Sequence, residues 1–322
     1  MVKYIQITSG AGESSLKLKI TVLCLLVLFT GCTRMSVEVS APPLIALSIE
    51  NRDSSLCIGI INEMSRFAAD SGYQFIFEGS ENSLKGQIRG ITTLLERDPD
   101  FLIISPVTSL GLEDQIDQSH KRGVGTILMN STTRVHNTGS LSSIIACDHV
   151  KEGALVSEAF STLSMGESTQ ILEIQGPILS SVTRDLALGF RQGLGLYENL
   201  YIAAVIENCG TRIEAYSDMR EALEKYGSSI DAIFAHNDRL GLGVQDALLE
   251  VGYKIPIISI GGSTDAAKAI LSTSYYGTVY REDGISPLFS MIRKHIENKS
   301  DFDSIVLKST FISAENARDL IP

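Results

Sequence analysis

The chain has 322 residues, of which 44% are hydrophobic and 20% charged, so it can build about two ordinary domains and is not a largely disordered protein. Its formal net charge is −11. The first 31 residues contribute +2, from three lysines and one glutamate, which leaves −13 on the rest of the chain. Because a body this acidic repels phosphate backbones, nucleic acid is excluded as a predicted partner.

The first segment of the chain is typical of an export signal. Lys17 and Lys19 precede an apolar run from Ile20 to Phe29, which is shorter than the roughly 20 residues of a membrane-spanning helix. The run leads into Leu28-Phe29-Thr30-Gly31-Cys32, which resembles a bacterial lipobox, although Phe29 stands where that motif more often has Leu or Val. The alternative is an ordinary signal peptide with an incidental cysteine. We expect a lipoprotein signal peptide at 1–31, a lipid on Cys32 as the only membrane anchor, and a tether at 32–43.

The other cysteines and the histidines do not indicate a metal or disulfide framework. Cys57, Cys147 and Cys209 are three in number and far apart in the sequence, whereas a disulfide framework needs an even and denser set. The spacing typical of zinc ligands does not occur among the cysteines and histidines. We therefore predict buried thiols, no metal and no cofactor.

Apolar, β-rich runs recur along the chain, and most are followed by segments with apolar residues three and four positions apart. Continuous apolar strands that alternate with helices are typical of parallel sheets covered on both faces. Nine strands exceed one usual open sheet, so we expect an α/β protein of two doubly wound, Rossmann-like lobes. The expected strands are Leu44–Ile49, Tyr73–Phe77, Phe101–Ser105, Thr126–Met129, Ser143–Cys147, Gln170–Ile174, Tyr201–Ile206, Ala232–Ala235 and Ile255–Ile260. The expected helices are Ile58–Ala69, Ile88–Glu96, Leu186–Leu194, Arg212–Lys225, Leu240–Val251 and Ala266–Leu271.

The segments that follow these strands are polar, small and prone to turns. In doubly wound sheets ligands bind beyond the carboxyl ends of the strands, so these segments are the expected site. Their side chains suit hydrogen bonding to a neutral or weakly charged solute. The segments are Glu50-Asn-Arg-Asp-Ser54, Ser105-Pro-Val-Thr108, Asn130-Ser-Thr132, Gln175-Gly-Pro177, His236-Asn-Asp238 and Gly261-Gly-Ser263.

At these positions the sequence resembles the type I periplasmic binding proteins for pentoses and hexoses, in particular the ribose- and galactofuranose-binding branch. The resemblance runs from about Leu44 to the C-terminus and is carried by Ile103-Ile-Ser-Pro-Val107, by Leu172-Glu-Ile-Gln-Gly176 with Arg184 and Gly189-Phe190, by Asp231-Ala-Ile-Phe-Ala-His-Asn-Asp-Arg-Leu-Gly-Leu-Gly-Val244 and by Ser313-Ala-Glu-Asn316. It implies an extracytoplasmic solute-binding lipoprotein of an ABC-type sugar uptake system, which captures a ligand by closing two lobes about a hinge.

The resemblance also implies the domain bounds and the ligand positions. The N-terminal lobe would comprise residues 44–147 plus 282–303 and the C-terminal lobe 148–281 plus 304–322, with chain crossings near Cys147-Asp148, Arg281-Glu-Asp283 and Asp301–Ser304. The implied ligand residues are Asp53, Ser54, Asn130, Ser131, Arg184, Asn237, Gly261 and Arg281.

Several of these residues have a structural alternative. Asp53 and Ser54 could cap the following helix. For Asn237 we expect ligand contact, with Asp238 left to cap the next helix. Arg184 opposes the dipole at a helix start unless a ligand or an acid compensates its charge, and it could also be a solvated surface residue.

The chain departs from the family pattern in ways that bear on the ligand. The family usually has an acid and an arginine where this chain has Asn130 and Ser131, and a further acid at Gly261, while Arg281 stands where Gln is more common. These changes leave two arginines and fewer acids. We therefore expect a sugar or sugar-like ligand, with an anionic member of that class, such as a sugar acid, as the hypothesis to test. The chain has no Trp, and an aromatic face would have to come from Tyr216, Tyr280 or His149.

Other functions share the fold or remain open. The closed form could be read by a two-component kinase or chemoreceptor instead of an ABC permease, and the sequence does not separate these partners. A transcriptional repressor is disfavoured because no helix-turn-helix precedes Leu44. An enzyme is the least favoured class, since the chain has no Gly-x-Ser-x-Gly elbow and no Walker-type loop; we predict no catalytic residues.

Overall fold

The first of two α/β lobes is built on a parallel sheet. The structure is a computed structural model that describes residues 41–50, 52, 55–163 and 168–321. In the first sheet the strand order is β11-β5-β4-β3-β1-β2, and every neighbouring pair is parallel. Its strands are β1 Leu44–Ile49, β2 Gln74–Gly79, β3 Phe101–Ile104, β4 Gly125–Met129, β5 Ser143–Cys147 and β11 Ile305–Leu307.

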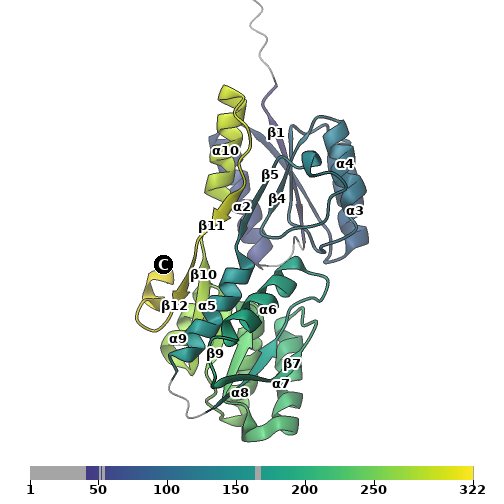
Figure 1. The fold of residues 1–322 in the computed structure, drawn as a ribbon. Helices are drawn as coiled ribbons and strands as arrows, with labels where there is room; N and C mark the ends of the chain where they lie inside the picture. The colour runs from purple at the N-terminus through teal and green to yellow at the C-terminus, as the bar shows by residue number, and fades with distance from the viewer. Residues whose placement is uncertain (1–40, 51, 53–54, 164–167, 322) are drawn as a thin grey trace, which may run out of the picture. The chain divides into compact units, whose positions relative to one another are not determined.

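Helices cover both faces of this first sheet (Figure 1). One core cluster joins the strands to α2 and α10, and another joins them to α3 and α4. The central strands β1 and β3 are buried almost throughout, which explains why they appear in the sequence as unbroken apolar runs. The helices are α2 Ser55–Asp70, α3 Leu84–Leu95, α4 Glu113–Lys121 and α10 Ile285–Asn298, with a short 3₁₀ turn at Thr138–Ser140.

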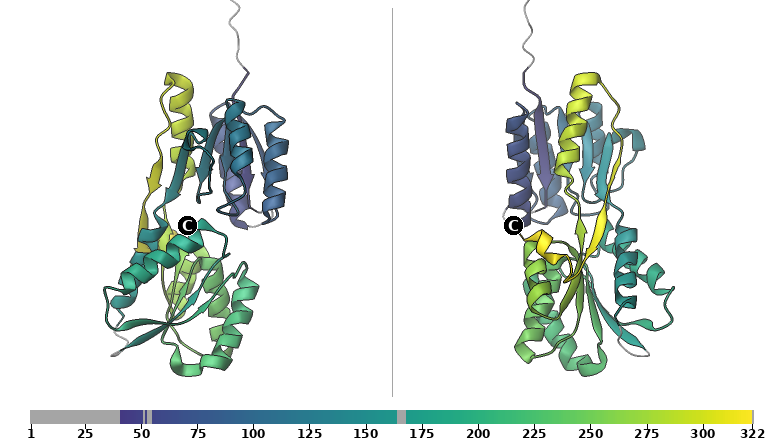
Figure 2. Two further views of the ribbon diagram at one scale, coloured as in Figure 1. Left: turned by 45° about the vertical axis from the view of Figure 1, so that its right-hand side comes forward. Right: turned by 90° about the vertical axis from the view of Figure 1, so that its left-hand side faces the viewer.

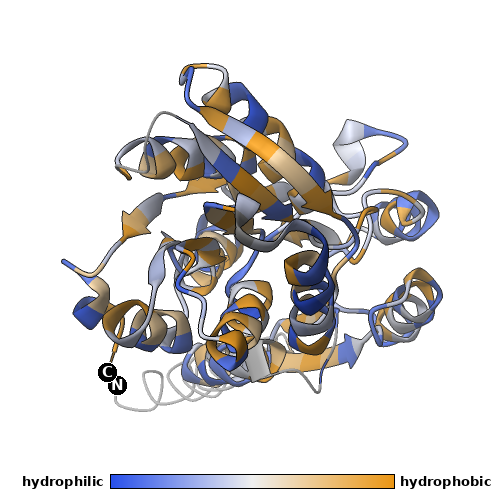
Figure 3. Ribbon diagram, turned by 90° about the horizontal axis from the view of Figure 1, so that it is seen from below, coloured by the Kyte–Doolittle hydropathy of each residue, from blue (hydrophilic) through white to orange (hydrophobic). Residues whose placement is uncertain are grey.

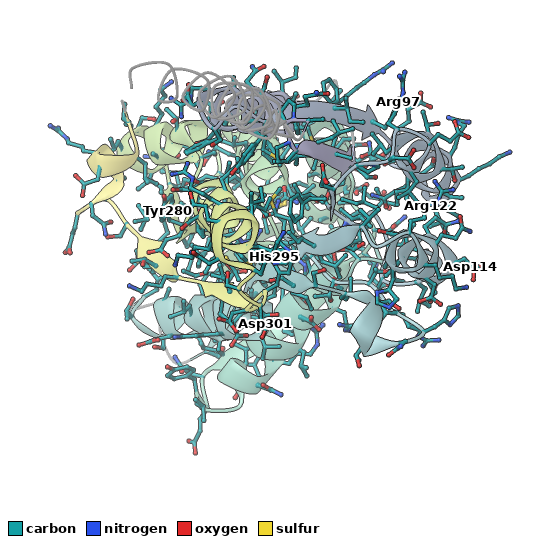
Figure 4. All side chains as sticks on the ribbon, turned by 90° about the horizontal axis from the view of Figure 1, so that it is seen from above. Arg97, Asp114, Arg122, Tyr280, His295 and Asp301 are labelled. Carbon is teal, nitrogen blue, oxygen red and sulfur yellow. The ribbon has the colours of Figure 1, made fainter. Side chains whose placement is uncertain are left out.

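The end of α10 is fixed by a histidine that packs between aromatic rings. His295, labelled in Figure 4, stacks on Phe302 with ring centroids 4.2 Å apart and meets the edge of Phe101 at 5.9 Å. Its Nδ1 hydrogen bonds to the Ser300 carbonyl oxygen at 2.8 Å. His295 is therefore part of the packing at one end of the lobe.

The second lobe has the same plan. Its strand order is β12-β10-β9-β8-β6-β7, and it is parallel except for β12, which runs antiparallel to β10. Its strands are β6 Thr169–Ile174, β7 Leu200–Ile206, β8 Ala232–Ala235, β9 Ile257–Gly261, β10 Tyr275–Arg281 and β12 Ser309–Ile312. The prediction of two doubly wound α/β lobes is thus confirmed.

Helices again lie on both faces of the second sheet (Figure 2). Helices α5 and α6 pack on one face, and α7, α8 and α9 pack on the other. The helices in Figure 3 have hydrophobic residues along one side and hydrophilic residues along another, as amphipathic surface helices do. Their bounds are α5 His149–Ser161, α6 Ser181–Leu194, α7 Arg212–Tyr226, α8 Asp238–Val251 and α9 Thr264–Ser272, with 3₁₀ turns at Gly227–Ser229 and Ala317–Leu320.

Helices α5 and α6 approach each other closely because glycines face the contact. A Cβ on Gly189 would lie 1.8 Å from the Val150 carbonyl oxygen, and one on Gly153 would lie 2.2 Å from the Leu186 carbonyl oxygen. Since a side chain at either position would push the backbones apart, these glycines set the spacing of the two helices.

The structure adds elements that the sequence pattern did not predict. Strand β10 and helices α4, α5 and α10 were absent from the expected set. The strand begins Tyr275-Tyr-Gly-Thr278 and so lacks the aliphatic run of its neighbours, while the buried face of α5 includes polar and small residues such as His149, Glu152, Gly153 and Ser157. Within the described part of the chain, every helix is too short or too polar to span a bilayer.

The predicted lobe boundary at 303/304 is wrong. Strand β11 pairs with β5 in the first sheet, with Val306 opposite Ala146, whereas β12 pairs with β10 in the second sheet. The third crossing therefore falls at Lys308, between β11 and β12, and residues 305–307 belong with the first lobe (Figure 1). The backbone fixes this crossing to the second one, since the Glu282 amide donates to the Lys308 carbonyl oxygen at 3.0 Å.

Candidate functional site

The strand order reverses direction at one point in each sheet, and the candidate site is built there. In the first sheet the reversal lies between β1 and β3, and in the second between β6 and β8. Chains leaving such neighbouring strands turn to opposite faces, which leaves a gap at their carboxyl ends where ligands of doubly wound folds bind.

Glu50 follows β1 at the first of these points. Its Oε1 accepts a hydrogen bond from Ser105 Oγ at 3.3 Å, and Ser105 follows β3. Burial raises the pKa of Glu50, although the Ser105 hydrogen bond and the positive charge of Arg239 on α8 oppose that rise. The sequence interpretation placed Glu50 in an expected site segment but did not name it as a ligand residue, although an acid directly after a buried strand was a usable signal.

A buried glutamine holds the segment that follows β3. Gln87 on α3 is fully buried; its Nε2 donates to the Ser105 carbonyl oxygen at 2.8 Å, and its Oε1 accepts from the Val107 amide at 2.9 Å. Because both hydrogen bonds go to backbone groups, the turn after β3 is held independently of any ligand.

Asn237 and Asp238 follow β8 at the second point, and the helix cap expected of Asp238 is made by Asn237. Asn237 is the N-cap of α8, where its Oδ1 accepts from the Leu240 amide at 3.0 Å. Asp238 is buried, and its carboxylate accepts from Ser259 Oγ, Thr278 Oγ1 and the Ser263 amide at 2.5, 2.7 and 2.6 Å. The prediction that Asp238 caps the helix is therefore wrong, because these three donors already bind its carboxylate.

Gly261, at the end of β9, gives room to that buried acid. Its φ is +149°, and a Cβ on it would lie 2.7 Å from Asp238 Oδ2. The family pattern has an acid at the position that is Gly261 here, and the carboxylate of Asp238 lies beside that position. The negative charge at this corner of the site is supplied by a neighbouring strand end.

Asn130 and Ser131 follow β4, and one forms hydrogen bonds through its backbone and the other through its side chain. Asn130 is exposed with φ +66°, a left-handed conformation that asparagine tolerates, and its carbonyl oxygen hydrogen bonds to His149 Nε2 at 2.9 Å. Ser131 is buried and donates from Oγ to the Pro106 carbonyl oxygen at 3.0 Å. Ser131 therefore ties the turn after β4 to the turn after β3.

Arg281, the last residue of β10, is paired with a buried acid. Its Nε and Nη2 donate to Glu152 Oε1 and Oε2 at 2.8 and 2.7 Å. Glu152 is fully buried on α5 and also hydrogen bonds to His149 Nδ1 at 2.8 Å and to Ser309 Oγ at 2.7 Å. This group of four, the hinge network, joins residues that flank all three crossings between the lobes.

The hinge network keeps Glu152 ionised. Burial alone would raise the pKa of its carboxyl group, but the hydrogen bond to His149 and the charge of Arg281 outweigh that effect and lower the pKa to about 2. A buried acid at neutral pH is tolerated because three side chains surround it with hydrogen bonds. The sequence interpretation did not identify Glu152.

Arg184 lies in the first turn of α6 and pairs with its neighbour. Its Nε and Nη2 donate to the Asp185 carboxylate at 2.8 and 3.1 Å, and its side chain is 62% exposed. Arg184 and Arg281 each have an internal carboxylate partner, and Glu50 and Asp238 add further acids. The premise of an anionic ligand, two arginines with few acids opposite, is therefore wrong.

Hydrogen bonds join the carboxyl edges of the two sheets. The Ser109 amide and Oγ, after β3, donate to the Leu179 carbonyl oxygen, after β6, at 2.9 and 3.0 Å. The Thr132 amide, after β4, donates to Ser181 Oγ at the start of α6 at 3.0 Å. The segments predicted to bind ligand thus face each other, as a two-lobed binding site requires.

Two of the three side chains proposed to stack on a sugar, His149 and Tyr216, bind other residues instead. His149 is buried with both ring nitrogens hydrogen bonded, and the Tyr216 hydroxyl donates to Glu250 between α7 and α8. Tyr280 is half-buried, one residue before Arg281, and packs where a Cβ on Gly262 would lie. Of these three candidates, Tyr280 is the one that lies at a strand end of the site.

Some predicted residues lie outside the described part of the chain. These are Asp53 and Ser54, the signal segment at 1–31 and Cys32. Cys147 and Cys209 are free thiols. Burial, with nearby acids, raises the pKa of Cys147 to about 11 and that of Cys209 to about 12, so both are protonated at neutral pH. The described residues contain no group of three that could hold a metal ion.

A family model described as a periplasmic binding protein domain matches residues 45–284. The chain therefore belongs to the periplasmic binding protein family, which confirms the resemblance inferred from its sequence. Its members are named for binding, and ligands of doubly wound folds bind at switch points of the kind described above.

Individual relatives are distant. The chain is 26% identical to the xylitol-binding protein of Mycolicibacterium smegmatis over 216 residues, 67% of this chain and 61% of that protein. It is 22% identical to the galactofuranose-binding protein of Escherichia coli over 92% of this chain and 95% of that one. A crystal structure of a galactofuranose-binding protein superposes with a TM-score of 0.82 at 21% identity, covering 87% of this chain and 97% of the other.

Proposed function

We propose that this protein is the extracytoplasmic solute-binding component of an ABC-type uptake system for a small, uncharged sugar or polyol. The observation that carries the proposal is the set of hydrogen bonds between Ser109 and Leu179 and between Thr132 and Ser181, which bring together the carboxyl edges of two doubly wound sheets. A ligand held by both edges would stabilise the closed form by its differential affinity for that form.

The polar groups at these edges suit hydroxyl ligands. Asn237 uses its Oδ1 for the helix cap, and its Nδ2 hydrogen bonds to no described residue, so the amide can donate to a hydroxyl oxygen. Glu50 can accept hydrogen bonds from hydroxyl groups through its carboxyl oxygens. The binding of xylitol and galactofuranose by the relatives named above supports a ligand of this chemistry.

Isothermal titration of the purified mature protein with neutral pentoses, hexoses and polyols tests the proposal. We expect one or more of them to bind, and we expect Asn237→Ala to weaken binding at least about tenfold, as losing one buried polar contact does. Asn298→Ala, at the exposed end of α10, is the matched control and should bind as the wild type does. The proposal fails if no neutral sugar or polyol binds, or if the two variants bind alike.

Export and anchoring form a separate part of the proposal. We propose that residues 1–31 are removed as a signal peptide and that Cys32 is then acylated, which would hold the protein at a membrane surface by lipid alone. In a bacterial host, labelled palmitate should enter the wild type and not Cys32→Ser, and the variant should leave the membrane fraction. Equal labelling of the two proteins would contradict this assignment.

The third part of the proposal concerns the partner protein that recognises the closed, ligand-bound form. We propose an ABC permease because the relatives are binding proteins of solutes, and a host lacking this protein should then lose uptake of the ligand identified by titration. Normal uptake, together with loss of a transcriptional response to that ligand, would instead assign the protein to a sensor kinase.

A further inference from the structure

Arg281 lies at a strand end of the site, and its positive charge is compensated by a buried carboxylate. Glu152 binds its Nε–Nη2 edge through two hydrogen bonds of 2.8 and 2.7 Å. The opposite nitrogen, Nη1, hydrogen bonds to no described residue, and the Arg281 side chain is 28% exposed. Arg281 therefore presents a hydrogen-bond donor to a ligand while its positive charge is already compensated.

The compensation is built into the fold. Glu152 is fully buried and is held by His149 and by Ser309 as well as by Arg281, so it cannot swing away when a ligand arrives. Asp238 adds a second negative charge that acts on Arg281. A ligand carboxylate or phosphate at this position would meet one guanidinium opposed by two fixed carboxylates, and it would gain little from pairing with the guanidinium.

We infer that Glu152 is a specificity-determining residue. Because it pairs with the Nε–Nη2 edge of Arg281, the site selects an uncharged ligand over the anionic form of the same sugar. The inference rests on the proposed function for its ligand class. It assigns the role to a residue on α5 that has no exposed surface and need not touch the ligand.

The test compares ligands that differ by one carboxylate. Galactose with galacturonate, and xylitol with xylonate, are titrated into the wild type, Glu152→Gln, Glu152→Gln/Arg281→Gln and Glu158→Gln. Glu158 lies on the exposed face of the same helix, so its variant is matched in charge but leaves Arg281 paired. We expect the wild type and Glu158→Gln to prefer the neutral member, and Glu152→Gln to shift that preference toward the acid by about tenfold or more. The double variant should lose the shift.

A second readout works without a sugar. Oxalate, compared with chloride at equal ionic strength, should raise the melting temperature of Glu152→Gln more than that of the wild type, Glu158→Gln or the double variant. If no sugar binds the wild type, the proposed function fails, while the oxalate comparison still decides the role of Glu152.

Two results would overturn the inference. One is a wild type that binds galacturonate or xylonate as tightly as the neutral partner, which is measured even if Glu152→Gln does not fold. The other is a folded Glu152→Gln whose ligand preference and oxalate response equal those of Glu158→Gln.

Discussion

Replacing Glu152 by Gln should remove a pH-dependent part of the protein's stability. Its pKa falls from 4.5 to about 2, which means that the folded state stabilises the ionised form of this carboxyl group more than the unfolded chain does. At about 1.4 kcal/mol for each tenfold change in the protonation equilibrium, the hinge network contributes about 3 kcal/mol at neutral pH. The carboxylate is fully buried, so solvent does not screen this contribution.

The sign of the pH dependence follows from the direction of the pKa change. A group whose pKa is lowered by folding stabilises the protein fully above its unfolded pKa, and the contribution disappears as the pH falls through the folded value. For Glu152 the contribution is complete above about pH 5, and about half of it is lost by about pH 3. The gap in unfolding free energy between wild type and Glu152→Gln should therefore narrow over this range.

Guanidinium unfolding at pH 7, 5, 4 and 3.5 measures that gap. At pH 7 we expect a loss of about 3 kcal/mol, or roughly 5 °C in melting temperature for a chain of this size. Glu158→Gln, on the exposed side of the same helix, should change stability by less than about 0.5 kcal/mol at every pH. A gap that is absent at pH 7, or that stays constant down to pH 3.5, would refute the reasoning.

Three further substitutions test the packing around the site. Asn237→Ser keeps a capping oxygen and should cost a few tenths of a kcal/mol, whereas Asn237→Ala should cost about 1 kcal/mol in chemical denaturation; equal losses would deny the cap. Gly261→Ala places a Cβ 2.7 Å from Asp238 Oδ2 at φ +149° and should lower stability by about 1–3 kcal/mol, so a neutral effect would show that the carboxylate moves freely. Gly189→Ala meets the Val150 carbonyl oxygen at 1.8 Å, and we expect it to reduce the yield of folded protein; a normal melting curve would contradict that contact.

The fold could be predicted from the sequence because its central strands carry their signal locally. Strand β1, Leu-Ile-Ala-Leu-Ser-Ile, is buried on both faces, and a short, nearly unbroken apolar run is typical of a strand inside a parallel sheet. Strand β10 could not be found in this way, because Tyr276 and Gly277 interrupt its apolar character. Its place is fixed instead by pairing with β9 and β12, which is long-range information.

The candidate site was predicted less completely, for a related reason. The strand ends were correctly placed, since they follow from strand bounds, but the partner of each charged residue depends on residues distant in sequence. Arg281 and Glu152 are 129 positions apart, and nothing local shows that one neutralises the other. Asn237 and Asp238 are adjacent, yet which of them caps α8 depends on Ser259 and Thr278. Charge balance at a site was therefore the feature least accessible to sequence reasoning.

The crossing at Lys308 has a consequence for the order of synthesis. Strands β11 and β12 are separated by this one residue, and they add the last strand to the first and second sheets respectively. All the other strands of both sheets have been made before either sheet receives this edge strand. Until then β5 and β10 each keep an unpaired edge, which is open to pairing with other strands. Both lobes therefore become complete together, once residues 305–312 have been made, and removal of that one short segment would take a strand from each sheet.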